Sequence, residues 1–567
     1  MSKGRRGARR CALGIDFGTE SARAVLVSLD DGQELATRVH RYEHGVLDET
    51  LPPPDDDVAL GPGWALQDPR DYLRAIQSTV RPALEEAGVA PDEVVGVGID
   101  VTSCTMLPTR ANGTPLCWID ELRRAPHAWV KLWKHHAAQP EADRITAAAA
   151  RRGDAWLARY GGRISSEWLF SKSLQILLEA PEVYAQADRL IEATDWIVWQ
   201  LTGRETRNSC TAGYKALWSK RDGFPADDYF ADLDPRFRHV VDEKLSRTIL
   251  PIGTRAGGLS EQAAAWTGLR PGTPVAVGNV DAHVSAPAAG VTEPGAMVII
   301  MGTSNCHILL GEAEATVKGI CGVVEDGVVP GLFGFEAGQP AVGDLLAWFT
   351  ETSVAAEWHE RARRSRTTLH HVLEEEAALL RPGATGLLAI DWWNGNRSVL
   401  VDAELSGLLV GMTLATRPPE VYRALIEATA FGTRVIVDAF EDAGVPVERI
   451  VACGGLPERN RLLMQVYADV LGRELAVTTS SQTPALGAAM FGAVAAGARG
   501  GGFDSIVEAS RHMAHLRSDP FRPIASHHDV YDRLYGEYRR LHDLFGRGGD
   551  DVMANLRRLR REATPNA

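Results

Sequence analysis

Two common nucleotide-binding signatures are missing from this sequence. It contains no Gly-Lys dipeptide, and no Gly-x-Gly-x-x-Gly pattern follows an apolar run. The first absence excludes a P-loop, and the second argues against the dinucleotide-binding βαβ unit. Any nucleotide site must therefore use another design.

Signals for secretion or membrane insertion are also missing. The seven cysteines form no Cys-x-x-Cys pair, which is typical of proteins in a reducing compartment. The longest stretch of small apolar residues, 485–497, is too short and too rich in Ala and Gly to cross a bilayer. The segment 1–10 is rich in Arg and Lys and leads directly into a strand pattern. It lacks the apolar core that a signal peptide requires. We therefore expect a cytoplasmic protein with no membrane partner.

Length and charge narrow the fold and the partners. At 567 residues the chain exceeds what one hydrophobic core supports, so we expect at least two domains. The net charge of -14 argues against a nucleic-acid partner. A phosphorylated ligand would then need local donors and a metal ion.

Short apolar runs alternate with helical patterns, which predicts an α/β fold. The clearest predicted helix covers residues 418–443, with Thr416 as its N-cap, two prolines in its first turn and Gly444 after its end. Buried strands are expected at residues 94–100, 274–280, 387–391 and 450–455.

One pattern occurs twice, half a chain apart. An apolar run reaches Asp16, the turn Gly18-Thr19 follows with Ser21 nearby, and a second apolar run begins. Residues 296–310 repeat this pattern around Gly302-Thr303-Ser304. Such strand-turn-strand units can direct backbone N–H groups at phosphate oxygens. The alternative interpretation is two ordinary hairpins.

Two acidic residues follow predicted strands. Asp16 stands just before the first glycine turn, where a carboxylate could hold Mg²⁺ beside phosphates or cap the turn. Asp281 follows the predicted strand 274–280 and could accept a proton from a substrate hydroxyl or serve as a helix N-cap. His283, two residues later, is interpreted as structural.

These segments together resemble the FGGY carbohydrate kinases. The order and spacing of the motifs agree over nearly the whole chain. The motifs are Asp16-Phe-Gly-Thr19, Asn279-Val-Asp281-Ala, Gly302-Thr-Ser304, Gly454-Gly455 followed by Arg459-Asn460, and Ala485-Leu-Gly487-Ala-Ala. The resemblance implies an α/β fold of two actin-like ATPase (ribonuclease H-like) domains with a cleft between them. It places a sugar-binding domain with the catalytic base at residues 10–290 and a nucleotide-binding domain at 291–550.

Further segments point to a particular substrate within that family. They resemble the members that phosphorylate the C5 hydroxyl of L-ribulose with ATP and Mg²⁺ in arabinose breakdown. The segments are Leu132-Trp-Lys-His-His136, Tyr160-Gly-Gly162, Ser165-Ser-Glu-Trp168, Thr211-Ala-Gly-Tyr-Lys215, Phe335-Glu336-Ala-Gly-Gln339 and Asp391-Trp-Trp-Asn-Gly-Asn-Arg397.

The resemblance also assigns roles to residues. Asp281 corresponds to the catalytic base, and Asp16 to a residue that holds Mg²⁺ through water. Sugar contacts are assigned to Ser103 through its backbone, Lys215, Glu336 and Asp281. The phosphate turns are Gly18, Thr19, Gly302, Thr303 and Ser304, and the adenosine side is Gly454, Gly455 and Asn460. From the residues alone, a surface lysine is the usual interpretation of Lys215, and core packing explains most tryptophans.

Other functions stay open at this point. D-ribulose or another ketopentose could be the substrate, since sequence does not show pocket shape. A non-catalytic sugar or nucleotide sensor could share the fold, and so could an actin- or chaperone-like ATPase acting on protein partners. The family resemblance also suggests a homodimer.

Overall fold

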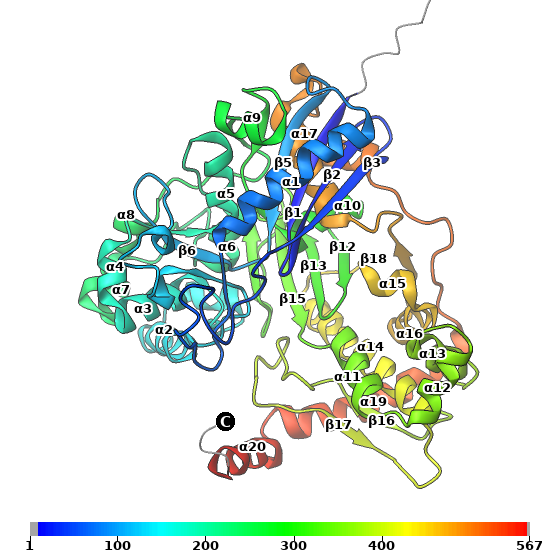
Figure 1. The fold of residues 1–567 in the computed structure, drawn as a ribbon. Coiled ribbons are helices and arrows are strands. Elements are labelled where there is room, and N and C mark those ends of the chain that lie inside the picture. The colour runs from blue at the N-terminus through cyan, green and yellow to red at the C-terminus, as the bar shows by residue number, and fades with distance from the viewer. Residues whose placement is uncertain (1–9, 564–567) are drawn as a thin grey trace, which may run out of the picture.

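The computed structural model describes residues 10–563, and two large β-sheets dominate it (Figure 1). The first has seven strands in the order β3-β2-β1-β5-β10-β9, with β11 paired to β5. Its strands are β1 Cys11–Phe17, β2 Ser21–Ser28, β3 Glu34–Arg41, β5 Val94–Val101, β9 Arg255–Gly258, β10 Pro274–Ala276 and β11 Asn279–Val280. All of them precede residue 281.

The second sheet has six strands in the order β14-β15-β13-β12-β18-β19. They are β12 Ala296–Met301, β13 Asn305–Gly311, β14 Gly322–Glu325, β15 Phe333–Gln339, β18 Arg449–Cys453 and β19 Leu475–Val477. In both sheets the first strand of a hairpin also pairs with a parallel strand on its other side. Strand β1 pairs antiparallel with β2 and parallel with β5, and β12 pairs antiparallel with β13 and parallel with β18. The repeated sequence pattern therefore corresponds to a repeated topology.

Two smaller sheets and the helices complete the fold. A four-stranded sheet runs in the order β4-β7-β6-β8, and β16 pairs with β17. Their strands are β4 Leu66–Gln67, β6 Met106–Thr109, β7 Val130–Lys131, β8 Arg189–Glu192, β16 Leu388–Ile390 and β17 Leu408–Val410. The helices up to residue 288 are α1 Pro69–Ala87, α2 Gln139–Arg152, α3 Leu169–Glu179, α4 Pro181–Gln186, α5 Ala193–Thr202, α6 Ser209–Lys215, α7 Asp227–Leu233, α8 Val240–Lys244, α9 Glu261–Thr267 and α10 Asp281–Ala288. Those that follow are α11 Gly343–Thr352, α12 Ala356–Arg364, α13 Leu369–Ala378, α14 Pro418–Asp442, α15 Gly455–Arg459, α16 Arg461–Leu471, α17 Thr483–Ala496, α18 Ile506–Met513, α19 Ala525–Gly546 and α20 Val552–Ala563.

Helix α17 belongs to the later part of the sequence but packs against the first sheet. Figure 1 shows it, in orange, beside the blue strands β1 and β5. Contact is close because glycines replace side chains: a Cβ atom at Gly14 would lie 1.8 Å from the carbonyl oxygen of Ala485, and one at Gly98 would lie 1.8 Å from that of Ala488. One hydrophobic cluster joins β2, α10, β12, β13 and α17. The two halves therefore share a core.

Most expected elements are present, with local differences. The strand expected at 94–100 is β5, and the helix expected at 418–443 is α14. The strand expected at 274–280 is split into β10 and β11, with residues 277–278 between them, and Gly278 lies so close to Thr194 that an added Cβ atom would be 2.2 Å from the Thr194 hydroxyl oxygen. Thr416 is not the N-cap of α14. That position is Arg417, whose amide donates to Glu420 Oε2 at 2.6 Å, while the Thr416 hydroxyl accepts the amide of Thr413.

No helix within residues 10–563 combines the length and the apolar character that crossing a bilayer requires.

Candidate active site

Three polar side chains stand in register where neighbouring parallel strands of the first sheet end. Asp16 of β1 is paired with Asp100 of β5, and Asp100 is paired with Asn279 of β11. Arg23 Nε lies 3.3 Å from Asp16 Oδ2. Burial raises the pKa of both aspartates, and the adjacent charge of Asp16 raises the pKa of Asp100 further. This edge therefore gathers carboxyl groups in an environment that desolvates them.

Asp281 lies next to this group, at the first residue of α10. The N-cap position itself is Val280, and Asp281 Oδ1 accepts the amide of Ala282 at 2.7 Å. Burial, together with the charges of Asp16 and Glu336, raises the pKa of Asp281 to about 7. A carboxyl group with this pKa can exchange a proton near neutral pH.

Lys215 and Glu336 form an ion pair between the two halves of the chain. Lys215 ends α6, Glu336 lies in β15, and Lys215 Nζ is 2.8 Å from Glu336 Oε2. The side chains are only 4% and 12% exposed, so Lys215 is not a surface lysine. Burial opposes both charges, but the pairing outweighs it, and the pKa of Lys215 is raised while that of Glu336 is lowered. Both groups stay ionised.

Several residues around this pair were not predicted as site residues. His283, interpreted from sequence as structural, has Nε2 3.3 Å from Glu336 Oε2 while its ring packs on Tyr214. The Lys215 ammonium lies 5.8 Å from the centre of the Trp168 ring. Arg397 Nη2, from the loop after β16, is 3.4 Å from Glu167 Oε1. Trp168 and Arg397 lie in sequence segments that resemble the family. This resemblance could have identified both as candidate site residues.

Ser103 lies in the loop between β5 and β6, next to this group. Its neighbour Cys104 is buried, and the Lys215 charge acts on the Cys104 thiol. The buried Lys172 holds the loop in place, because its ammonium group donates to the carbonyl oxygens of Cys104 and Leu132, each at 2.7 Å. The Ser103 backbone is therefore fixed close to the Lys215 and Glu336 pair.

The first glycine turn is closed and anchored. The amide of Gly18 donates to the Ser21 carbonyl at 3.0 Å. The Thr19 hydroxyl accepts a hydrogen bond from Trp133 Nε1 at 3.0 Å, and the Thr19 carbonyl accepts one from Gln67 Nε2 at 2.7 Å. These two contacts use an acceptor position of the Thr19 hydroxyl and the Thr19 carbonyl, and the hydroxyl keeps its own proton to donate.

The second glycine turn lies beside Gly454. The amide of Gly302 donates to the Ser304 carbonyl at 3.0 Å, and the carbonyls of Gly302 and Thr303 accept amides from residues 342–344 at the start of α11. Gly454 has a φ of +96°, and a Cβ atom there would lie 2.5 Å from the Met301 carbonyl oxygen. Thr303 and Gly455 are exposed. The ends of β12 and β18 thus bring Gly302, Thr303 and Ser304 next to Gly454 and Gly455.

Asn460 is occupied by contacts within the protein. It is the N-cap of α16, where its Oδ1 accepts the amide of Leu463 at 2.8 Å, and its Nδ2 donates to the Tyr422 hydroxyl at 3.2 Å. The side chain is buried. In this structure Asn460 acts as a helix cap.

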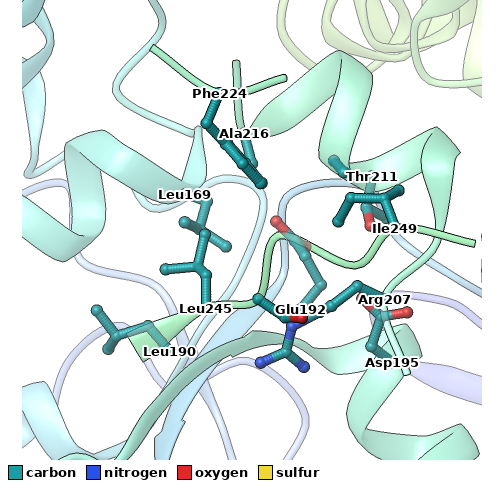
Figure 2. Close-up of a pocket in the computed structure, with 12 residues that line it drawn as sticks. Leu169, Leu190, Glu192, Asp195, Arg207, Thr211, Ala216, Phe224, Leu245 and Ile249 are labelled. Atoms are coloured by element: carbon teal, nitrogen blue, oxygen red, sulfur yellow. The ribbon is translucent and has the colours of Figure 1, made fainter. Parts of the chain in front are cut away.

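A small cavity lies behind α6 and involves none of the predicted site residues (Figure 2). Glu192, Asp195 and Arg207 form its polar wall. Asp195 Oδ1 accepts from Asn208 Nδ2 at 2.8 Å, and Asn208 Oδ1 accepts the amide of Thr211 and thereby caps α6. This wall supports the helix that ends at Lys215.

Comparisons with known proteins identify the family. Residues 11–287 match the N-terminal domain model of the FGGY family of carbohydrate kinases, and residues 297–496 match its C-terminal domain model. Proteins named ribulokinase from Anoxybacillus flavithermus and Geobacillus thermodenitrificans are each 56% identical over 555 residues, which is 98% of this chain and 98% of theirs.

The crystal structure of xylulose kinase from Rhodospirillum rubrum has a TM-score of 0.74 at 24% identity, and the match covers 94% of this chain and 98% of that one. This match supports the predicted two-domain α/β fold. On the strength of its domains and its relatives, the chain belongs to the FGGY family of carbohydrate kinases.

Proposed function

We propose that this protein transfers the γ-phosphoryl group of ATP to the C5 hydroxyl of L-ribulose, giving L-ribulose 5-phosphate in L-arabinose catabolism. The observation that carries the proposal is the buried Lys215 and Glu336 pair beside Asp281. The relatives named ribulokinase support the choice of sugar, with 56% identity over nearly the whole chain.

Asp281 takes the role of general base. Its carboxylate accepts the proton of the C5 hydroxyl as that oxygen bonds to the γ-phosphorus and the bond to the leaving ADP breaks. Glu336 accepts hydrogen bonds from sugar hydroxyls, Lys215 donates to sugar oxygens, and the backbone at Ser103 completes the contacts. Phosphoryl transfer depends mainly on such positioning and on charge stabilisation.

The two glycine turns would hold the phosphates. The turns Gly18-Thr19 and Gly302-Thr303-Ser304 are assigned to phosphate oxygens, and Gly454, Gly455 and Asn460 to the adenosine side. Since the amides of Gly18 and Gly302 already donate within their turns, the remaining residues of each turn would supply the donors. Asp16 is assigned to Mg²⁺, through water. The carboxylate oxygens gathered around Asp16 are hard ligands of the type that Mg²⁺ prefers. When bound, the ion would neutralise charge on the phosphates.

The wider arrangement follows from these roles. We propose residues 10–290 as the sugar-binding domain that carries the base, and residues 291–550 as the nucleotide-binding domain. We also propose a cytoplasmic homodimer whose ligands are a ketopentose and ATP, without a nucleic-acid partner. Light scattering of the purified protein tests the dimer.

An assay of ADP release tests the substrate. D- and L-ribulose, D- and L-xylulose and glycerol are compared at equal ATP and Mg²⁺ concentrations. L-Ribulose is expected to give the highest kcat/KM. A higher kcat/KM for another sugar would show that the protein is a kinase with a different substrate. If the sugars bind but none of them causes ADP release, the protein would be a sensor.

A further inference from the structure

Asp100 is a buried carboxyl group for which the fold provides no hydrogen-bond donor. The residue is 0% exposed, and within residues 10–563 neither of its carboxyl oxygens has a hydrogen-bond donor as partner. Its partner in the neighbouring strand β1 is another acid, Asp16. The negative charge of Asp281 also raises the pKa of Asp100. Burying a carboxyl group in this way costs free energy.

Contacts among the described residues offset this cost only in part. The Arg23 charge favours an ionised Asp100, and a protonated Asp100 can hydrogen-bond to Asp16. The Arg23 guanidinium is shared, however, with its Nε 3.3 Å from Asp16 Oδ2 and its Nη1 donating to Gln482. Asn279, in register on the other side, uses its Oδ1 to accept the amide of Val280. A buried polar group that native structure leaves unsatisfied calls for a partner from outside the chain.

The chemistry of the group indicates what that partner is. Asp16 and Asp100 end adjacent parallel strands, so two oxygen donors of the same kind stand side by side next to Asp281. Carboxylate oxygens in such a group suit a hard divalent cation. A cation would also relieve the repulsion among the carboxylates themselves.

We propose that Asp100 is a second carboxylate of the divalent-cation site, acting with Asp16, and that the chain retains it for the cation and not for the fold. The proposal rests on the proposed function only in that nucleotide phosphates complete the coordination of the ion. Asp100 is missing from the sequence-based assignment, although it ends an apolar run just as Asp16 does.

Binding of Mn²⁺ in the presence of ADP tests the proposal without any turnover. The full-length protein, Asp100→Asn and Asp16→Asn are titrated with Mn²⁺, and free Mn²⁺ is followed by electron paramagnetic resonance. Asp391→Asn is the matched control, because Asp391 is also buried but is bonded to Tyr538 and Gln339 in the second half. Both Asp100→Asn and Asp16→Asn should weaken Mn²⁺ binding at least tenfold, and the control should not. Unchanged Mn²⁺ affinity in Asp100→Asn overturns the proposal.

Thermal unfolding gives the second readout. Without metal, Asp100→Asn should unfold at the same or a higher temperature than the natural protein, since it removes an unpartnered carboxyl group. Addition of Mn²⁺ and ADP should then stabilise the natural protein more than the variant. A variant that fails to fold would show that Asp100 serves the fold and would also overturn the proposal. If Mn²⁺ binding depends on Asp100 while no ketopentose is phosphorylated, the proposed function fails and this inference stands.

Discussion

The ammonium nitrogen of Lys215 lies 2.8 Å from Oε2 of Glu336, although 121 residues separate the two in the sequence. Lys215 ends a helix that precedes the first sheet's last strands, and Glu336 lies in the second sheet. The pair therefore joins the two halves of the chain at the candidate site. Any relative movement of the halves must carry this pair along or break it.

Removing one member of this pair should strongly destabilise the protein. Lys215→Met leaves the Glu336 carboxylate buried without its counter-ion, and breaking a buried pair in this way typically costs about 3–5 kcal/mol. Denaturant unfolding measures the loss. The double variant Lys215→Met/Glu336→Leu should recover most of the stability but not turnover. The matched control is Arg38→Met, whose pairing with Glu86 is largely exposed on both sides and should contribute less than about 1 kcal/mol. Equal losses in Lys215→Met and Arg38→Met would contradict the expectation.

Replacing Asp281 should separate binding from chemistry. Asp281→Asn keeps the size of the side chain but cannot accept the hydroxyl proton, so kcat should fall by about 10²–10⁴-fold. Calorimetry should show that sugar and ATP still bind. Near-normal turnover in the purified variant would remove Asp281 from the role of base.

The pH dependence of the reaction should report on the same residue. Since burial raises the pKa of Asp281 to about 7, the carboxyl group is protonated below that pH and cannot act as a base. The value of kcat/KM should therefore rise with pH, with a slope near one on a logarithmic plot, and level off above about pH 7. The residual activity of Asp281→Asn should lack this rise. A natural enzyme with a flat profile between pH 5 and 8 would contradict the assignment.

The sequence predicted the local features of the site better than its long-range contacts. The two glycine turns, the strand ends at Asp16 and Asp281 and the helix α14 can be read from apolar runs and turn residues, because these depend on near neighbours. The pairing of Lys215 with Glu336 cannot, since it depends on how the halves pack.

Other contacts of the site also depend on residues that are distant in the sequence. Trp133, distant in sequence, takes the hydroxyl of Thr19. His283 faces Glu336 because the second sheet approaches α10 at that position. Asp100 could have been found by comparing it with Asp16.

A methyl group at Gly98 should disturb the packing of α17. The new Cβ atom would lie 1.8 Å from the Ala488 carbonyl oxygen, which belongs to the backbone and cannot rotate away. Gly98→Ala should therefore lower the free energy of unfolding by at least about 1–3 kcal/mol. Gly536→Ala is the control, because this exposed position in α19 has no atom within 4 Å of the added Cβ and should gain about 0.5–1 kcal/mol. Comparable stability of the two variants would show that α17 can shift at no cost.

Asn460 allows a helix cap to be distinguished from a nucleotide contact. Asn460→Ala removes the acceptor for the Leu463 amide and should cost about 1 kcal/mol. Asn460→Asp keeps that acceptor, and the Tyr422 hydroxyl, which accepts from Asn460 Nδ2, can donate to the second carboxylate oxygen instead, so stability should stay close to that of the natural protein. If Asn460 also contacts adenosine, both variants should raise KM for ATP and leave KM for the sugar unchanged. Thr368→Ala removes the equivalent cap of α13, where the Thr368 hydroxyl accepts the His371 amide at 3.2 Å, and should lower stability without changing KM for ATP. Unchanged KM for ATP in both Asn460 variants would leave Asn460 with the role of a cap alone, because the two substitutions together remove every polar contact that its amide can make.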